Sequence, residues 1–291
     1  MAARADGPGG TPPPSGERAR AFLAALAASQ DAIVETPVML VVAHPDDETI
    51  MLGAQMPRLP RLEIVTVTDG APADMKDARA RGFETREAYA EARRREQAAA
   101  VALAGVPEEA LGALGFGDQT AAHRLRELCA MLAALFAARA PEIVVTHALE
   151  GGHPDHDAVA FAVRAARLLA MWGGAQAPEI VEAPLYRLRE KMRVFQHFGE
   201  DAGAPETTLA LDETRRDLKR RMMDAHATQA AVLAPFTPEV ERLRPAQPVD
   251  TDALPNAGAL HYELHPWGLD GKTWLARVAA ARAELDLPRT L

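Results

Sequence analysis

Short apolar runs that do not alternate with polar residues are the main pattern in the first two thirds of this chain. The run 38–43 has six apolar residues in succession, which is typical of a strand buried on both faces of a parallel sheet. Further runs predict strands over 62–70, 111–116, 142–148 and 179–186. Between the strands, charged or amphipathic stretches predict helices over 50–55, 87–104, 123–139 and 158–170.

The order of these elements predicts the fold class. Each strand is followed by a helix or loop before the next strand, so the connections are βα crossovers, which are right-handed in nearly all proteins. We therefore expect an α/β fold with a Rossmann-like, mostly parallel sheet flanked by helices, and a less regular C-terminal region. The loop 71–85 lies at the carboxyl edge of this sheet, as either a substrate lid or a solvated connection. No Gly-x-Gly-x-x-Gly motif follows the first strand, so a dinucleotide is not implied.

The two ends of the chain carry weaker patterns. Residues 1–16 are rich in Ala, Gly and Pro and predict a flexible tail. The apolar stretch 21–27 is short and no cleavage pattern follows it, so we interpret it as an amphipathic helix packed on the domain and not as a signal peptide. We expect a single domain over 17–291, with a core of 37–190 and a C-terminal cap or extension of 191–291.

Within this C-terminal region the pattern predicts edge strands over 192–198 and 207–211. A helix is expected over 212–233, with its basic residues, including Lys219, on the exposed side. The proline-rich stretch 235–255 predicts an extended loop.

Composition and charge exclude several function classes. The 291 residues carry a net charge of −9, whereas a nucleic-acid surface needs clustered Lys and Arg in excess of their partners, so we expect no nucleic-acid partner. No segment approaches the roughly 18–20 apolar residues of a membrane span, so we expect no membrane association. The single cysteine, Cys129, fits a reducing compartment, and we place the protein in the cytoplasm. The sequence leaves a homo-oligomer open.

Residues with metal-binding chemistry follow the first predicted strand. His44, Pro45, Asp46 and Asp47 stand in succession where the chain leaves the sheet, and ligands of open α/β sheets bind at this carboxyl edge. Imidazole and carboxylate groups bind zinc, but either aspartate is also a good N-cap for the helix that follows. This motif alone therefore leaves helix capping and metal binding equally open.

A second motif repeats the order of strand, histidine, proline, acid and helix. The predicted strand 142–148 is followed by Glu150-Gly-Gly-His-Pro-Asp-His-Asp157 and then by an apolar helical run. His44, Asp47 and His156 would supply two imidazoles and one carboxylate, which is the three-ligand set of a catalytic zinc that keeps its fourth position for water. The repeat favours a metal site over a helix cap.

This ligand set leaves other side chains free for chemistry. Asp46 would act as the general base for a water whose pKa zinc lowers to about 7. His153 would stabilise the tetrahedral oxyanion and protonate the departing amine, with Asp155 holding its orientation and charge. These roles together predict the hydrolysis of an amide.

The two motifs resemble those of a known family. Ala43-His-Pro-Asp-Asp-Glu48 and His153-Pro-Asp-His156 are similar to the motifs of the PIG-L/LmbE-like zinc-dependent N-acetylglucosaminyl deacetylases, and the resemblance extends over roughly 38–163. It implies a small-molecule amino-sugar substrate and a Zn²⁺ cofactor, with other divalent ions such as Fe²⁺ left open. It implies the same roles as the residue chemistry: ligands His44, Asp47 and His156, base Asp46, and His153 as electrophile or acid.

The resemblance also implies substrate contacts. Arg93-Arg-Arg-Glu96 with Leu103-Ala-Gly105 looks like a family pattern in which the arginine reaches substrate, although a surface ion pair between Arg93 and Glu96 is the plainer alternative. Asp118 follows the third predicted strand, where the family often places an aspartate that contacts substrate.

Two further stretches can be compared with the family. Lys219 and His226-Ala-Thr-Gln229 look like a family pattern, which we attribute to the polar face of a docked helix. Gly151 stands where some relatives carry a tyrosine that assists at the oxyanion. This departure implies that the oxyanion depends more on zinc and on His153.

Two rival function classes share part of the pattern. Two histidines and a carboxylate are also the triad of non-haem Fe(II) oxygenases, but that class usually has His-x-Asp in an all-β barrel, whereas His44 and Asp47 are separated by two residues. A non-catalytic sugar- or metal-binding module would not need the spare Asp46 and His153. We therefore expect a zinc-dependent hydrolase that removes the N-acetyl group from an N-acetylglucosamine-type sugar or conjugate.

One histidine cluster remains outside this site. His261, Glu263 and His265 are spaced by two residues, which predicts one side of a strand. We expect this segment to cover the sugar pocket and not to bind the catalytic metal.

Overall fold

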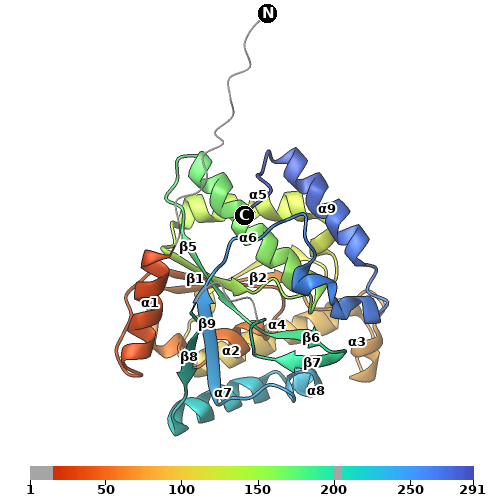
Figure 1. Cartoon of the computed structure of the whole chain (residues 1–291). Coiled ribbons are helices and arrows are strands. Elements are labelled where there is room, and N and C mark those ends of the chain that lie inside the picture. Colours follow the sequence, from red (N-terminus) through yellow and green to blue (C-terminus); the bar gives the residue numbers. More distant parts are fainter. Residues whose placement is uncertain (1–15, 200–204) are drawn as a thin grey trace, which may run out of the picture.

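A seven-stranded sheet with the order β3-β2-β1-β4-β5-β9-β8 forms the centre of the protein (Figure 1). The computed structural model describes residues 16–199 and 205–291, so the predicted tail lies outside the described residues apart from Gly16. The strands of this sheet are β1 (Val38–Val42), β2 (Leu62–Thr68), β3 (Leu111–Phe116), β4 (Ile143–His147), β5 (Glu179–Ala183), β8 (Thr207–Ala210) and β9 (Val240–Pro245). The first five strands pair in parallel, and β9 and β8 add an antiparallel edge. The predicted fold class is confirmed.

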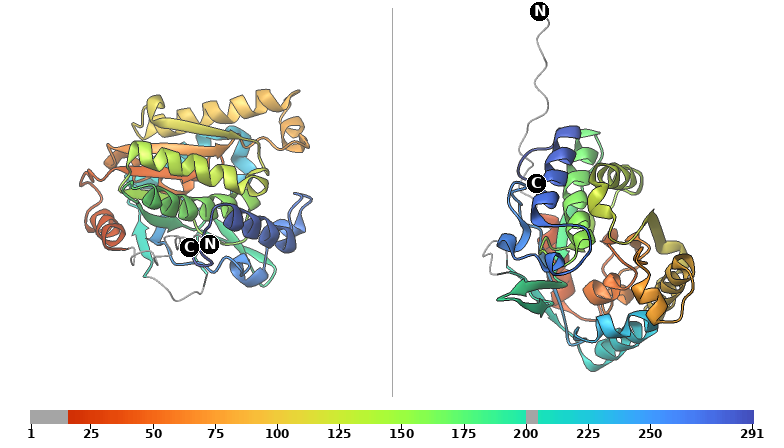
Figure 2. Two further views of the ribbon diagram at one scale, coloured as in Figure 1. Left: turned by 90° about the horizontal axis from the view of Figure 1, so that it is seen from above. Right: turned by 90° about the vertical axis from the view of Figure 1, so that its right-hand side faces the viewer.

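Helices cover both faces of this sheet (Figures 1 and 2). They are α1 (Glu17–Ala28), α2 (Asp47–Leu52), α3 (Lys76–Ala80), α4 (Arg86–Leu103), α5 (Leu125–Arg139), α6 (Pro154–Trp172), α7 (Glu213–Ala225), α8 (Ala230–Leu233) and α9 (Gly271–Glu284). Short 3₁₀ turns are η1 (Met56–Arg58), η2 (Glu108–Ala110), η3 (Ala121–His123), η4 (Ala227–Gln229), η5 (Pro255–Gly258) and η6 (His261–Leu264).

Strand β1 is buried on both faces, as its apolar run predicts. Met39 and Val41 pack into the core that contains residues of α5, α6 and α9. Leu40 and Val42 point to the opposite core, which contains residues of α1, α2, α4 and α7. All four side chains are at most 1% exposed, so β1 anchors the loop that follows it firmly in the molecule.

The predicted strand 179–186 is two strands in the structure. Pro184 separates β5 from β6 (Tyr186–Arg189), which pairs with β7 (Met192–Phe195) in a separate two-stranded hairpin. A proline has no N–H to continue a ladder. The segment predicted as an edge strand over 192–198 is therefore the outer strand of this hairpin and not an edge of the central sheet.

The proline-rich stretch predicted as a loop contains a central-sheet strand. β9 pairs with β5 and with β8, and its Leu243 is fully buried. The prediction over 235–255 was wrong because the prolines of this stretch lie outside the strand, except for Pro245 at its last residue.

The predicted helix 212–233 is interrupted. Helix α7 ends before His226, and the backbone N–H and the hydroxyl of Thr228 bond to Glu96 instead of continuing the helix. Lys219 was expected on the exposed face but is fully buried, since its Nζ donates to Ile50 O at 2.7 Å and to Glu241 Oε1 at 3.0 Å.

One loop prediction and one strand prediction also differ from the structure. The loop 71–85 contains the short helix α3, and its Pro72 and Asp77 line the central cavity. His261 and Glu263 lie in η6 and not on a strand.

None of the helices in 16–199 and 205–291 combines the length and the hydropathy that crossing a bilayer requires.

Candidate metal centre and active site

A cavity of about 380 Å³ opens at the carboxyl ends of β1 and β4, where the loops with the two sequence motifs meet. Most of the predicted site residues line it: His44, Asp46, Asp47, Arg93, Asp118, His153 and His156. Asp155 is fully buried and does not line the cavity. The parallel sheet thus brings together motifs that lie more than a hundred positions apart.

The side chains of Asp46 and Asp47 do not cap helix α2. Asp46 occupies the N-cap position, but its side chain accepts no hydrogen bond from the helix, and its φ of 146° lies in a region that favours glycine. A strained torsion of this kind costs about 1–3 kcal/mol and is typical of functional sites. Asp47 turns back and accepts a hydrogen bond from His44 N at 2.8 Å. The capping alternative for this motif is therefore wrong.

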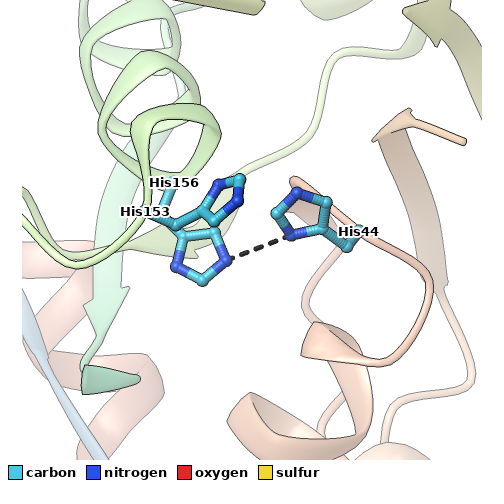
Figure 3. A group of neighbouring side chains, drawn as sticks. All are labelled: His44, His153 and His156. Atoms are coloured by element: carbon cyan, nitrogen blue, oxygen red, sulfur yellow. Dashed lines mark hydrogen bonds between the residues drawn. The ribbon is translucent and has the colours of Figure 1, made fainter. Parts of the chain in front are cut away.

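The three predicted metal ligands lie together, and Figure 3 shows two of them, His44 and His156, with their rings facing each other beside His153. His44 Nδ1 lies 3.2 Å from His156 Nε2 and 3.4 Å from an oxygen of Asp47, and His156 Nε2 lies 3.4 Å from the other oxygen of Asp47. Donor atoms around a tetrahedral zinc with bonds of about 2.0 Å are separated by about 3.3 Å. The spacing of these three donors therefore fits a zinc ion.

The charge around His44 also fits a cation. His44 Nε2 lies 3.1 Å from Asp118 Oδ1 and 3.4 Å from Asp155 Oδ2, on the side of the ring opposite Asp47. Burial by itself would lower the pKa of His44, but hydrogen bonds to Asp118, Asp155 and Asp47 raise it well above its usual value. Carboxylates buried this closely need a positive partner, and a bound divalent ion would supply it.

His153 has a defined tautomer because it is the N-cap residue of α6. Its Nδ1 accepts a hydrogen bond from Asp155 N at 3.1 Å, so the proton of the neutral ring lies on Nε2. Burial, followed by the neighbouring His44 and His156, lowers the pKa of His153 well below its usual value. His153 can therefore offer an Nε2–H donor while it remains neutral.

The predicted role of Asp155 differs from its placement in the structure. Its carboxylate accepts hydrogen bonds from Gln119 N at 2.6 Å and from Ala121 N at 3.0 Å. The backbone N–H of Asp155, and not its carboxylate, orients His153. Asp155 thus ties the start of α6 to the loop after β3 and faces His44.

Arg93 holds the predicted base. Its Nη2 donates to Asp46 Oδ2 at 2.9 Å and to Pro45 O at 3.0 Å, and its Nη1 donates to Gly70 O. The alternative of a surface ion pair with Glu96 is wrong, because Arg93 is only 6% exposed and bonds to Asp46. Burial raises the pKa of Asp46 to about 6, and the charge of Arg93 opposes this rise. A carboxylate with such a pKa is suited to accept a proton near neutral pH.

The comparisons with known proteins agree with this geometry. The sequence model of the PIG-L family, described as GlcNAc-PI de-N-acetylase, matches residues 39–167. Residues 39–167 are therefore similar to the PIG-L family. The family is one of deacetylases, and both motifs lie within the matched residues. No curated protein matches the chain significantly.

Solved structures share the fold of this chain at low identity. A triple mutant of a deacetylase involved in teicoplanin biosynthesis is 19% identical with a TM-score of 0.56, covering 72% of this chain and 97% of that chain. The N,N'-diacetylchitobiose deacetylase of Pyrococcus horikoshii is 16% identical with a TM-score of 0.51, covering 78% and 91%. The 4-carboxy-2-hydroxymuconate hydratase of Pseudomonas putida KT2440 is 16% identical with a TM-score of 0.52, covering 74% and 98%. These likenesses show the fold alone.

One histidine beside the predicted ligands was missed by the sequence analysis. His147 ends β4, stacks on His156 with ring centroids 4.2 Å apart, and accepts a hydrogen bond from Ala43 N at 2.8 Å. Its Nε2 lies 3.4 Å from Asp47, and its buried Nδ1 has no hydrogen-bond partner within the part of the chain that the structure describes. The available signal was its place at the carboxyl end of a predicted strand beside the first motif.

Glu48 was also missed, although it lies inside the first motif. It accepts hydrogen bonds from Asp46 N at 3.0 Å and from Gln97 Nε2 at 2.9 Å, and lies 3.4 Å from His226. Glu48 and His226 are fully buried. They fix the backbone of the loop that carries Asp46, so the His226 stretch is part of the support of the site and not only the polar face of a helix.

The loop at Gly151 and Gly152 is covered by the C-terminal region. His261 N donates to Gly151 O at 2.7 Å, and a Cβ on Gly152 would lie 2.1 Å from Tyr186 O. This close approach brings Tyr186, His261 and His265 to the cavity wall.

Proposed function

We propose that this protein is a zinc-dependent hydrolase that removes the N-acetyl group from an N-acetylglucosamine-type sugar or its conjugate. Water adds to the amide carbonyl and the C–N bond then breaks, which releases acetate and a free amine. The observation that carries the proposal is a cluster of two imidazole nitrogens and the two Asp47 oxygens, with contacts of 3.2–3.4 Å, beside a buried carboxylate and a histidine that this set does not require. The PIG-L match over 39–167 supports it.

His44, Asp47 and His156 would hold the metal. A bound zinc would polarise the amide carbonyl and lower the pKa of a water at the site. Asp118 accepts a hydrogen bond from His44 Nε2 at 3.1 Å, and such a contact orients a ligand imidazole and fixes its tautomer. Fe²⁺ would accept the same donors, so the metal must be measured. Contact of Asp118 with the substrate remains a prediction.

Asp46 would accept the proton of the attacking water. Its carboxylate lines the cavity next to Asp47 and is held by Arg93. This contact keeps Asp46 in one position beside the ligand set. Arg93 therefore acts through Asp46, and its direct contact with the substrate remains a prediction.

His153 would stabilise the developing oxyanion and the leaving amine. Its Nδ1 is occupied by Asp155 N, so the Nε2–H remains to donate to the carbonyl oxygen. The departing nitrogen takes up the proton that the attacking water lost, by way of Asp46 or His153. Removing one preorganised donor of this kind typically costs 10²–10³-fold in kcat.

The test is amine release from a panel of N-acetylated sugars, using protein purified without added metal and assayed for its metal content. We expect turnover that a chelator abolishes and zinc restores. Turnover that requires an oxoacid and O₂ would instead identify an Fe(II) oxygenase. Sugar or metal binding without any turnover would identify a binding module. We also propose a cytoplasmic location, supported by the single buried thiol of Cys129.

A further inference from the structure

Arg193 is a cation at the cavity wall that the proposed chemistry does not use. It lies on β7, is exposed, and lines the cavity. Its guanidinium carbon lies 5.2 Å from the centroid of the Phe195 ring, a contact that orients the planar group. Within 16–199 and 205–291, no carboxylate forms an ion pair with it. Its five N–H donors are therefore available to a ligand.

Two imidazoles of the C-terminal region line the same cavity. His261 Nδ1 faces Gly152 O at 3.2 Å and so carries the proton, and His261 Nε2 lies 3.3 Å from His265 Nε2. Burial, the neighbouring His265 and Arg193 lower the pKa of His261 to about 4. Partial burial and Arg193 also lower the pKa of His265. The two rings thus bond to Gly152 O and to each other, and they share the cavity wall with Arg193.

The acids near this corner are engaged elsewhere. Glu263 accepts a hydrogen bond from Gly271 N at 2.7 Å and does not line the cavity. Asp77, an acid of the wall from α3, lies 3.6 Å from Arg81. The corner therefore combines a permanent positive charge with imidazole groups and no carboxylate partner among the described residues.

Another part of the cavity wall is apolar. It is formed by Leu185, which precedes β6, and by three side chains in and after α8, Val232, Leu233 and Phe236. A charged group placed against these side chains would lose its hydration without compensation. An anion in this cavity would therefore lie at the corner of Arg193 and not along this wall.

We propose that Arg193, with His261 and His265 beside it in the cavity wall, forms a subsite for an anionic substituent, a phosphate or a carboxylate, on the amino-sugar substrate. This inference rests on the proposed function, because it identifies which N-acetylated sugars the same site would prefer. The planar guanidinium matches two oxygens of a phosphate or carboxylate. A second metal ion between the two imidazoles would be opposed by the charge of Arg193.

The test compares three substrates that differ in charge at constant ionic strength. They are methyl N-acetyl-α-D-glucosaminide, which is neutral, N-acetylglucosamine 1-phosphate, and N-acetylmuramic acid, which carries a carboxylate. We expect kcat/KM to be higher for at least one anionic sugar than for the neutral one. In Arg193→Gln this ratio should fall about 10-fold or more, mainly through KM, because the contact binds ground state and transition state alike. Arg193→Lys should keep part of the preference.

Arg124→Gln is the matched control. Arg124 also lies over a phenylalanine ring, with its guanidinium carbon 4.3 Å from the centroid of Phe116, but it pairs with Glu127 and does not line the cavity. Its substrate ratio should equal that of the wild type. Equal kcat/KM values for all three sugars, or an Arg193→Gln ratio that does not change, would overturn the inference and leave the deacetylase function intact.

A direct binding measurement separates the two proposals if none of the three sugars is hydrolysed. Calorimetry of N-acetylglucosamine 1-phosphate binding to the zinc-loaded wild type and to Arg193→Gln then decides. A loss of about 10-fold in affinity in the variant supports the anionic subsite, and equal affinities overturn it. Failure of hydrolysis would count only against the proposed reaction.

Discussion

Asp46 combines a strained backbone torsion with a side chain that forms an ion pair with Arg93 at 2.9 Å. Its carboxylate lines the cavity and accepts no capping hydrogen bond from α2. The same peptide is held by Glu48 through the N–H of Asp46. The torsion is therefore maintained by buried contacts on both sides.

Asp46→Asn tests the role of this residue. We expect kcat to fall by about 10²- to 10⁴-fold, because the amide cannot accept the proton, while zinc content stays near that of the wild type. Asp77→Asn is the control, since Asp77 is a carboxylate of the same cavity that contacts none of the donor atoms. Loss of zinc from Asp46→Asn with normal turnover per bound metal would assign it to the ligand set instead.

Cys129 gives a test of the native packing of α5. It is fully buried, and burial raises the pKa of its thiol to about 12. Alkylation requires the thiolate, so we expect no reaction with iodoacetamide at pH 8 in the folded protein and one equivalent after denaturation. Rapid modification of the folded protein, followed by mass spectrometry, would contradict this packing.

At this scale the sequence identifies residues better than it identifies their partners. The predicted site residues could be found because both motifs directly follow buried strands, whose carboxyl ends meet at one edge. The partner of Asp155 could not, because it depends on the path of the loop after β3. His147 belongs to neither motif, so only its place at the end of β4, before the second motif, connected it with the site.

At the scale of the elements, a buried ion pair between Lys219 and Glu241 joins helix α7 to strand β9 of the sheet. Lys219 and Glu241 are at most 1% exposed, and Glu241 also accepts hydrogen bonds from Ala54 N and Gln55 Nε2. Helix α7 and strand β9 therefore meet around a charge that water does not reach.

Lys219→Met should destabilise the protein by about 3–5 kcal/mol, because it leaves the Glu241 carboxylate buried without a cation. The double variant Lys219→Met/Glu241→Gln should lose less than the single variant. Guanidinium unfolding at equilibrium measures both free energies. A single variant within about 1 kcal/mol of the wild type would show that this pair behaves like an exposed one.

Gly152→Ala tests the contact between the second motif and the hairpin β6–β7. Because the added Cβ would lie 2.1 Å from Tyr186 O, we expect a loss of about 1–3 kcal/mol in unfolding free energy and lower activity. Gly112→Ala in β3 is the control, since its Cβ would meet neighbours at 3.7 Å and beyond. Equal melting temperatures for the two variants would contradict the close approach.

The strands from β1 to β5 could be predicted because apolar residues recur in each of them and helical stretches or loops separate them, even though β5 also carries the buried Glu179 and Glu182. Strand β9 could not, since Glu241 is a charged residue in a buried position and only its pairing with Lys219 makes that burial acceptable. The end of α7 could not be predicted either. The backbone N–H and the hydroxyl of Thr228 donate to Glu96 of α4, and the helix does not continue through this residue. In both cases the structure depends on a contact between residues that are distant in the sequence.

For the whole molecule, metal binding should be visible as stability. A ligand that binds only the folded state stabilises it by RT ln(1 + [L]/Kd), which is about 2.7 kcal/mol at a hundredfold excess over Kd. We expect a chelator to lower the melting temperature and zinc to restore it in the wild type and in Asp46→Asn. His156→Ala should show no such shift. A shift of normal size in His156→Ala would remove this residue from the ligand set.

The segment matched by the family, 39–167, contains every predicted site residue but only part of the central sheet. A fragment of residues 39–167 would leave β4 as an edge strand. All five of its residues would lack β5, the strand that pairs with them in the full chain. An unpaired apolar edge strand of this kind pairs with other chains and promotes aggregation. The two motifs are therefore not separable from the residues after 167, where β5 covers β4 and where β9 and β8 extend the sheet on which those motifs depend.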